Sequence, residues 1–262
     1  MTNPQGSFIW YELLTKDATA AKTFYDSVVG WNIEAQSSSP GMDYRMIHVH
    51  DGLTGAVMQL NADMIAHGGR ATWLGYIGVD DVDASVASIV ADGGAVHLPA
   101  FDIPGVGRIA MVTDPQGMPF YVMRGASDQS SNVYQRMGVQ HIGWNELQTP
   151  DDAAALAFYE KQFGITKVGV MPMGPMGDYH FIANAESKGD AIGAIMPTNP
   201  QSRSGWAFYF NVPDIHAAQA ALEAGGGKVL HGPNEVPGGQ LVIQAEDPEG
   251  VFFGLAGPGA AA

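Results

Sequence analysis

The sequence predicts an α+β protein of two tandem domains, and three observations lead to that prediction. The chain repeats itself once along its length, and within each half a strand, a helix and three further strands occur twice. With 262 residues, of which 46% are hydrophobic, the chain is long and apolar enough for a sizeable buried core. Its 34 glycines and 16 prolines indicate the many turns that such a strand-rich fold needs.

The repeat is displaced by 134 positions, the spacing from Trp10 to Trp144. Residues 10–13 read Trp-Tyr-Glu-Leu and residues 144–147 read Trp-Asn-Glu-Leu, each within an apolar run typical of a strand. We therefore predict one domain over residues 1–125 and a second over residues 133–262. The small polar stretch 126–132 has the composition of a linker between them.

The first unit of each half begins with a strand and a helix. In the first half the strand is expected over residues 8–14 and the helix over 17–29, where Ala18, Phe24, Tyr25 and other apolar residues recur at helical spacing. Asp17 is the expected N-cap of this helix. Three strand-like runs follow, at residues 31–36, 44–49 and 55–60.

The second unit repeats this order. We expect a strand over residues 72–79, then a helix over 82–92 that ends at a Gly-Gly pair. Short strands follow near Val96, over 108–112 and over 120–123. Between the last two, Asp-Pro-Gln-Gly at residues 114–117 predicts a turn, because proline presets φ and glycine permits the reversal. The same motif, Asp-Pro-Glu-Gly, precedes the last strand of the second half.

Four βαβββ units in two domains, with Asp-Pro-x-Gly before each last strand and Phe-Tyr late in each first helix, resemble the glyoxalase/bleomycin-resistance/extradiol-dioxygenase superfamily, which has the vicinal oxygen chelate fold. The resemblance covers about residues 7–255, and the Trp-x-Glu-Leu strand is similar to that of two-domain glyoxalase-like bacterial proteins. It implies an incompletely closed, cup-shaped barrel in each domain, with a ligand cavity inside the curved sheet. It also implies either a glyoxalase-like lyase or dioxygenase-related enzyme, or a protein that sequesters a drug without turning it over.

Metal-dependent members of this superfamily place His, Gln or carboxylate ligands at four positions in each domain. Counted onto this chain, the eight positions are Trp10, Met58, Leu74, Tyr121, Trp144, Met196, Ala207 and Gly254. None of these residues is a usual ligand of a divalent cation. We therefore expect no metal at the superfamily's usual position and no other cofactor, and we leave open an unusual divalent site built from other residues.

Glu12 and Glu146 are the candidate catalytic residues. Residues two apart in a strand share a face, so these glutamates should lie beside Trp10 and Trp144 and look into the implied cavities. A carboxylate in such a place suits a general acid or base. Two alternatives stay open: the glutamates orient a hydroxyl or amine of a ligand, or they bond to an arginine or to backbone amides and stiffen the sheet.

The remaining candidates for ligand contact are aromatic or charged residues at equivalent positions of the repeats. Besides the two tryptophans already named, they are Tyr44, Tyr179, Arg45, His180, Trp73 and Trp206. The alternative for the aromatic residues is a purely structural place in the core. His48 and His50 alternate on one strand, and we interpret them as solvated residues at the edge of a loop.

The composition of the chain makes some classes of binding partner unfavourable. The net charge of −15 disfavours nucleic acid and anionic membranes, because both repel an acidic protein. The chain has no cysteine, which excludes thiol catalysis and thiolate metal sites. There is no recognisable signal peptide and no apolar run of membrane-spanning length, so we expect a cytoplasmic protein. The expected partner is a small-molecule ligand, and the expected oligomeric state is a monomer or a homodimer.

Overall fold

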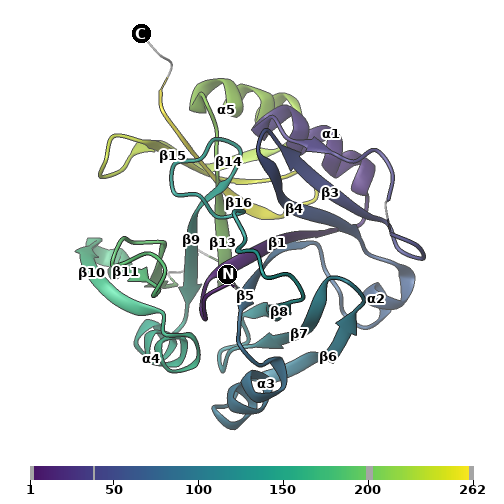
Figure 1. The fold of residues 1–262 in the computed structure, drawn as a ribbon. Helices are drawn as coiled ribbons and strands as arrows, with labels where there is room; N and C mark the ends of the chain where they lie inside the picture. Colours follow the sequence, from purple (N-terminus) through teal and green to yellow (C-terminus); the bar gives the residue numbers. More distant parts are fainter. Residues whose placement is uncertain (1–2, 38, 199–202, 260–262) are drawn as a thin grey trace. The chain divides into compact units, whose positions relative to one another are not determined.

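The computed structural model describes residues 3–37, 39–198 and 203–259 (Figure 1). The first half of the chain contains, in order, β1 (Phe8–Thr15), α1 (Ala18–Val29), β2 (Asn32–Ile33), β3 (Tyr44–Val49), β4 (Gly52–Gln59), α2 (Ala62–Ala66), β5 (Thr72–Gly78), α3 (Val82–Ala91), β6 (Ala95–Ile103), β7 (Gly107–Thr113) and β8 (Pro119–Gly125). The predicted order of strands and helices is confirmed. The differences are local: β2 is shorter than the predicted run, and the short helix α2 was not predicted.

The second half repeats this order. It contains β9 (Ile142–Thr149), α4 (Asp152–Phe163), β10 (Thr166–Pro172), the 3₁₀ turn η1 (Gly174–Met176), β11 (Asp178–Ala183), β12 (Gly193–Pro197), β13 (Gly205–Asn211), α5 (Ile215–Ala224), β14 (Lys228–Glu235), β15 (Leu241–Glu246) and β16 (Phe252–Gly257). Each half is therefore a pair of βαβββ units, which confirms the predicted α+β architecture.

The strands form two open sheets of eight. Their orders are β2-β3-β4-β1-β5-β8-β7-β6 in the first half and β10-β11-β12-β9-β13-β16-β15-β14 in the second. Within each βαβββ unit the first strand runs parallel to the last, as β1 does to β4 and β13 does to β16. Neighbouring strands that follow one another along the chain within a unit pair antiparallel, as β3 does with β4 and β15 with β16. Because each sheet ends in edge strands instead of closing, the arrangement fits the incompletely closed cup that the resemblance implies.

The predicted helix start is confirmed by its cap. The side chain of Asp17 accepts hydrogen bonds from the backbone amides of Thr19 and Ala20, which have no partner inside helix α1. Asp151 caps α4 in the same way through Ala154 N. Gly30 ends α1 at φ +80°, a left-handed conformation that glycine adopts without steric cost.

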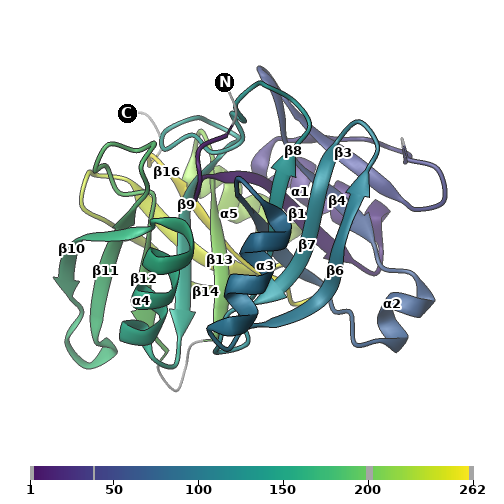
Figure 2. The ribbon, with the colours of Figure 1, turned by 60° about the horizontal axis from the view of Figure 1, so that its bottom comes forward.

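Contacts divide the chain into two compact units, and each unit takes residues from both halves of the sequence. One unit comprises Met1–Trp10, Leu74–Ser131 and Trp144–Trp206; the other comprises Tyr11–Trp73, Asn132–Gly143 and Ala207–Ala262. In the first, α3 lies against β6, β7 and β8 (Figure 2), and in the second α1 contacts α5. The domain boundaries at residues 125 and 133 follow the sequence repeat and stay a prediction.

A cluster of aromatic rings forms much of the core of the second unit. Phe210 is fully buried, and its ring lies 4.8 Å from Trp31, 5.0 Å from Trp73 and 5.7 Å from Phe253, measured between centroids. Tyr25 on α1 packs against the same rings, 5.5 Å from Trp73 and 5.4 Å from Phe253. Buried aromatic pairs of this kind add to the stabilisation that comes from removing their surface from water.

Each compact unit also contains a buried Trp-Tyr-Asp network. The Nε1 of Trp206 donates to the hydroxyl of Tyr159 at 3.1 Å, and that hydroxyl donates to Oδ2 of Asp114 at 3.2 Å. Trp73, Tyr25 and Asp247 make the equivalent bonds in the other unit at 3.0 and 3.1 Å. The aspartates are the first residues of the Asp-Pro-x-Gly turns, so each motif closes a turn and joins it to a helix.

Burial changes the acidity of these groups. It raises the pKa of Tyr159 well above the usual range for tyrosine, so the hydroxyl keeps its proton and serves as a donor. Burial also raises the pKa of the Asp114 carboxyl, although backbone amides of the turn partly offset this effect. The carboxyl of Asp247 has a raised pKa for the same reason.

Replacing Asp114 by asparagine is expected to cost less stability at neutral pH than at pH 4. Because the pKa of Asp114 is raised by folding, its favourable contribution is complete below the unfolded value of about 4 and is lost as the pH rises through the folded-state value. Asparagine does not titrate, so the stability of D114N does not fall with rising pH through this group, and the difference from wild type shrinks. Urea unfolding of wild type and D114N between pH 4 and 7 measures the difference.

Asp83 offers a control, because folding lowers its pKa whereas folding raises the pKa of Asp114. It is exposed, and its bond to the Arg108 guanidinium lowers its pKa, so its contribution is lost as the pH falls. The difference between wild type and D83N should therefore shrink toward acid pH. A D114N difference that stays constant from pH 4 to 7 would contradict the assignment.

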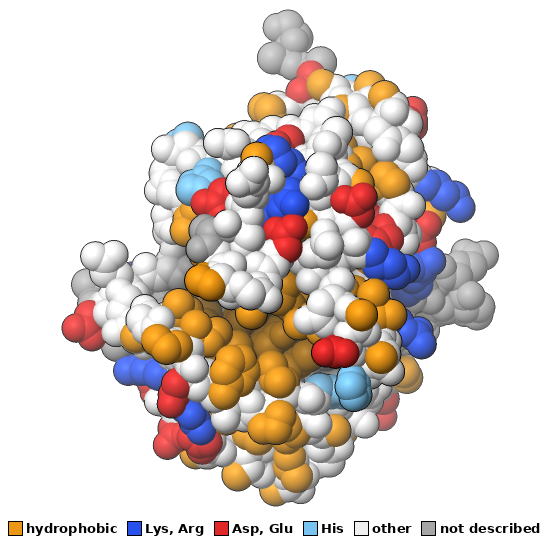
Figure 3. Space-filling model, turned by 90° about the vertical axis from the view of Figure 1, so that its right-hand side faces the viewer, with side chains coloured by type: hydrophobic (Ala, Val, Ile, Leu, Met, Phe, Trp, Pro, Cys, Tyr) orange, Lys and Arg blue, Asp and Glu red, His pale blue; other side chains and the backbone are white. Residues whose placement is uncertain are grey.

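The surface charge and the length of the helices bear on possible partners. On the face shown in Figure 3, the Lys and Arg side chains stand in small groups with Asp and Glu side chains near them. The expectation that nucleic acid is not bound rests on the net charge of −15 and stays a prediction. Among the helices that the structure describes, none is both long and apolar enough to cross a membrane.

Candidate functional site

Glu146 lies at the centre of a hydrogen-bonded cluster on β9 and β11. Its side chain is only 3% exposed, and Oε2 accepts a bond of 2.8 Å from the hydroxyl of Tyr179. The same hydroxyl accepts a bond of 2.7 Å from Nε1 of Trp144. On the other side, Gln148 Nε2 donates to Oε1 of Glu146 at 2.8 Å. Three residues that the sequence singled out therefore lie together here: Trp144, Glu146 and Tyr179.

The hydrogen bonds of Glu146 follow from two features: side chains alternate between the two faces of β9, and β12 has two small residues, Gly193 and Ala194, beside Glu146. Trp144, Glu146 and Gln148 are two apart and share a face of the strand. Ala194 of β12 is aligned with Glu146 on one side and with Phe181 of β11 on the other. Because alanine is small, the Tyr179 side chain can reach across β12 to the carboxylate. The Gly-Ala pair at this point occurs in both halves of the sequence, which is the signal of a close approach.

The glycine of that pair is needed for a different reason. A Cβ added to Gly193 would lie 1.9 Å from the carbonyl oxygen of Asn145 on the neighbouring strand, far inside contact distance. Gly55 has the equivalent constraint, with 2.5 Å to the carbonyl oxygen of Tyr11. The two strands therefore approach closely in both halves, next to Glu146 and to Glu12.

Gln148 is a member of the cluster that the sequence did not single out. It is buried, and because a carboxylate only accepts, the amide nitrogen must face Glu146 and the amide oxygen must face away. That Oε1 is buried and accepts no hydrogen bond from any residue that the structure describes. A buried acceptor with no donor is costly, so the site favours a ligand that brings one.

The first half has the same plan with one difference. Glu12 is 2% exposed on β1 and is aligned with Ala56 of β4, as Glu146 is with Ala194. Tyr44, the counterpart of Tyr179, is partly exposed on β3. In place of Gln148 stands Leu14, which has no hydrogen-bonding side chain. The two glutamates are therefore equivalent in position and differ in their polar neighbours.

Arg45 and His180 lie on the other face of their strands. The Nε2 of His180 is 2.7 Å from Oδ2 of Asp152, in the first turn of α4. The guanidinium of Arg45 bonds to both carboxylate oxygens of Asp43 and to the hydroxyl of Thr19 on α1, and it lowers the pKa of Asp43. Arg45 follows Tyr44 in the sequence and points toward α1, and His180 follows Tyr179 and points toward α4.

The other predicted contacts are placed elsewhere. The indole N–H groups of Trp73 and Trp206 belong to the buried Trp-Tyr-Asp networks described above. Trp10 is partly exposed on β1.

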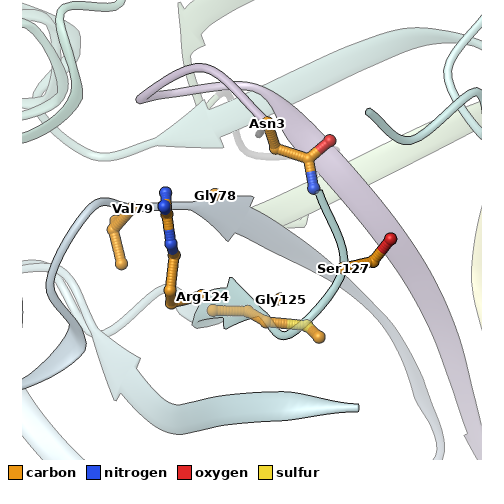
Figure 4. Close-up of a pocket in the computed structure, with 7 residues that line it drawn as sticks. Asn3, Gly78, Val79, Arg124, Gly125 and Ser127 are labelled. Atoms are coloured by element: carbon orange, nitrogen blue, oxygen red, sulfur yellow. The ribbon is translucent and has the colours of Figure 1, made fainter. Parts of the chain in front are cut away.

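Two of the recesses in the part of the chain that the structure describes are not lined by Glu146. The one in Figure 4, between residues that include Asn3, Val79 and Arg124, has a volume of about 10 Å³, room for about one water molecule. The other, of about 280 Å³, lies between α1 and the turn that contains Asp247 and Glu249. The aromatic-lined cavity expected from the sequence stays a prediction.

The superfamily's metal positions hold residues that do not fit a metal. Leu74 and Ala207 are buried and carry no donor, and the Tyr121 ring stacks on Tyr76 with centroids 4.3 Å apart. At Gly254 a Cβ would lie 2.2 Å from the Tyr209 ring, so no carboxylate has room there. An ion such as Zn²⁺ or Mn²⁺ needs imidazole or oxygen ligands in a fixed array.

Comparison with known proteins agrees with this architecture. The Glyoxalase/Bleomycin resistance protein/Dioxygenase superfamily matches residues 7–122 and 138–255. The chain belongs to this superfamily. It is 32% identical over 254 residues to "Putative glyoxylase CFP32" of Mycobacterium tuberculosis, covering 97% of this chain and 95% of that protein. It is 29% identical over 266 residues to "Anthracycline biosynthesis protein DnrV" of Streptomyces peucetius, covering 95% and 92%.

Two solved structures share this fold. The Mn(II)-bound glyoxalase from Novosphingobium aromaticivorans aligns with a TM-score of 0.63 at 16% identity, over 98% of this chain and 83% of that one. The 2,2',3-trihydroxybiphenyl 1,2-dioxygenase from Sphingomonas wittichii aligns with a TM-score of 0.66 at 12% identity, over 97% and 91%. At these identities the likeness concerns the fold and not the reaction.

Proposed function

We propose that this protein is a glyoxalase-like enzyme that binds a small molecule with an aromatic or planar part and acts on it by acid/base catalysis through Glu146. The single observation that carries this proposal is the buried carboxylate of Glu146, held by Tyr179 and Gln148. Glu12 is the equivalent candidate in the first half. No metal at the superfamily's usual position is part of the proposal, because the residues there are not ligands.

The cluster offers a defined set of contacts to such a ligand. Both carboxylate oxygens of Glu146 are acceptors, and Gln148 Oε1 is a further buried acceptor with no hydrogen-bond partner among the residues that the structure describes. The site therefore suits a ligand with O–H or N–H donors. The partly exposed rings of Trp144 and Tyr179 supply apolar surface beside these acceptors.

The chemistry open to this cluster is proton transfer. A carboxylate that removes a proton from a carbon next to a carbonyl, and returns it to the neighbouring atom, isomerises the substrate without any change of oxidation state. The bond from Tyr179 keeps the carboxylate in one orientation, and burial keeps water away from it. Glu146 serves as base in the first step and, once protonated, as acid in the second.

The relatives support a small-molecule role. One is named "Putative glyoxylase CFP32" and another "Anthracycline biosynthesis protein DnrV", and both align over more than nine tenths of this chain. Anthracyclines are planar polycyclic compounds with hydroxyl and carbonyl groups, which matches the ligand chemistry that the cluster favours. We therefore choose two probe classes: a polycyclic aromatic polyketide and a thiol adduct of a 2-oxoaldehyde.

A second candidate is binding without turnover. Both oxygens of Glu146 already accept bonds from protein side chains, an arrangement that also suits a fixed acceptor for a ligand hydroxyl or amine. Such a protein would sequester a drug or metabolite, as bleomycin-resistance relatives do. This candidate predicts tight binding of a probe and its release unchanged.

Incubation with both probe classes, followed by mass spectrometry and NMR, separates the two candidates. The enzyme proposal expects product from wild type and none from E146Q, with turnover unaffected by a chelator. If wild type binds a probe and returns it unaltered at all times, and E146Q only weakens binding, the sequestration candidate holds instead. E12Q, measured in parallel, tells which half of the chain carries the activity.

A further inference from the structure

A cluster of possible metal ligands lies apart from the Glu146 site. It consists of His50 and Asp51, at the turn between β3 and β4, and His141, which precedes β9. One nitrogen or oxygen atom from each residue lies within 4.8 Å of the others. The three residues belong to the same compact unit, although Asp51 and His141 are 90 positions apart in sequence.

His141 is held in one orientation by its surroundings. It is fully buried, and its Nδ1 lies 3.2 Å from the carbonyl oxygen of Val133. Because a carbonyl only accepts, Nδ1 is the donor in this contact, which leaves Nε2 as the nitrogen that can present a lone pair to a metal ion. Metal-binding histidines are commonly oriented by such a bond from the second ring nitrogen to a backbone carbonyl.

The Nε2 lone pair of His141 faces a carboxylate. Oδ1 of Asp51 is 2.9 Å away, so two acceptors confront each other unless a positive species lies between them. Gln135 donates to Oδ2 of Asp51 at 3.0 Å and lies 3.1 Å from Nε2 of His141, which steadies both groups. His50 is mostly exposed, with its Nδ1 3.9 Å from the same Asp51 oxygen.

We propose that His50, Asp51 and His141 bind a divalent transition-metal ion such as Zn²⁺. Two imidazole nitrogens and one carboxylate oxygen form a donor set that such ions favour. Ligand atoms at about 2.0–2.2 Å from one ion lie roughly 3–4 Å apart, so a small rotation of the exposed His50 side chain completes the set. Positions on the solvent side remain for water.

This site is distinct from the superfamily's metal positions and does not rest on the proposed function. Its residues join the β3–β4 turn to the segment that precedes β9, so a bound ion would fasten these two segments together. The expected consequence is therefore a gain in stability and not a catalytic step. Metal removal should lower the unfolding temperature and leave ligand binding at Glu146 unchanged.

Titration of the chelator-treated full-length chain tests the proposal. Zn²⁺ measured by calorimetry, and Co²⁺ measured by its visible absorption, should bind with one-to-one stoichiometry and raise the unfolding temperature. H50A and D51N alter exposed or half-exposed residues and should weaken binding by about tenfold or more. H67A, which removes an exposed histidine at the end of α2 outside the cluster, should bind as wild type does.

Two results would overturn the proposal. If neither ion binds saturably, the positive species between His141 and Asp51 is a proton, and the cluster is an ordinary ion pair. If H50A and D51N bind with wild-type affinity, the ion sits elsewhere on the chain. Circular dichroism of each variant shows whether a loss of binding comes with a loss of folding. A variant that keeps both its fold and its affinity would contradict the assignment.

Discussion

Replacement of Glu146 by glutamine is expected to lower turnover by about 10²- to 10⁴-fold, the usual contribution of a positioned general acid or base. Glutamine has the same shape and its oxygen still accepts the bond from Tyr179, while the amide of Gln148 can turn to accept from the new NH₂ group. The cluster should therefore stay folded while its ability to take up a proton is lost. Steady-state kinetics with the probe that wild type converts is the measurement.

Two further variants test whether a loss of turnover in E146Q comes from the Glu146 carboxylate itself. E12Q changes the equivalent buried carboxylate of the first half, where Leu14 stands in place of Gln148. We expect it to retain most of the activity. Y179F keeps the carboxylate and removes the hydroxyl that orients it, so it should lower turnover by less than E146Q does. Full activity in E146Q, with wild-type stability, would remove Glu146 from the mechanism.

Replacement of Phe210 by alanine is expected to lower the free energy of unfolding by about 3–5 kcal/mol, the usual cost of emptying a buried aromatic position. The ring is fully buried among Tyr25, Trp31, Trp73 and Phe253, so its loss leaves a cavity that the neighbouring large rings cannot fill without moving. Urea unfolding followed by tryptophan fluorescence reports on this region directly.

Phe101 provides the matched control for Phe210. It is the same residue type at 39% exposure on the edge strand β6, so F101A removes much less buried surface. Its effect on the free energy of unfolding should stay below about 1 kcal/mol. Equal losses in the two variants would mean that the ring cluster around Phe210 is not a centre of stability.

Much of the candidate site was predictable, because the duplication marks the same places twice. Trp144, Glu146 and Tyr179 recur as Trp10, Glu12 and Tyr44, and the alternation of a strand predicts that the tryptophan and the glutamate share a face. Gln148 was not predictable in this way, because its counterpart in the first half is Leu14 and the repeat therefore carries no signal at that position. Its importance follows only from the bond to Glu146.

Other predicted contacts depended on which way a side chain points. Arg45 and His180 follow the two tyrosines directly, and a neighbouring strand residue faces the opposite side. Sequence equivalence therefore selected these positions, but the packing of α1 and α4 decided that both turn to a helix. The N–H groups of Trp73 and Trp206 are likewise used by tyrosines on those two helices.

The sequence by itself determined the order of strands and helices, the duplication and the membership of the superfamily. The strands and helices depend on local periodicity, on caps such as Asp17 and on turn motifs, all of which act between residues close together in the chain. The duplication and the superfamily follow from the order of the residues itself. Only the tertiary structure decided that Tyr179 and Gln148 hold Glu146 and that His141 meets Asp51. The contacts of Tyr179 and of His141 join residues on different strands or segments, so their partners are set by sheet register and packing, which no local pattern encodes. Gln148 and Glu146 lie two apart on β9, and the direction of their side chains depends on the packing around that strand.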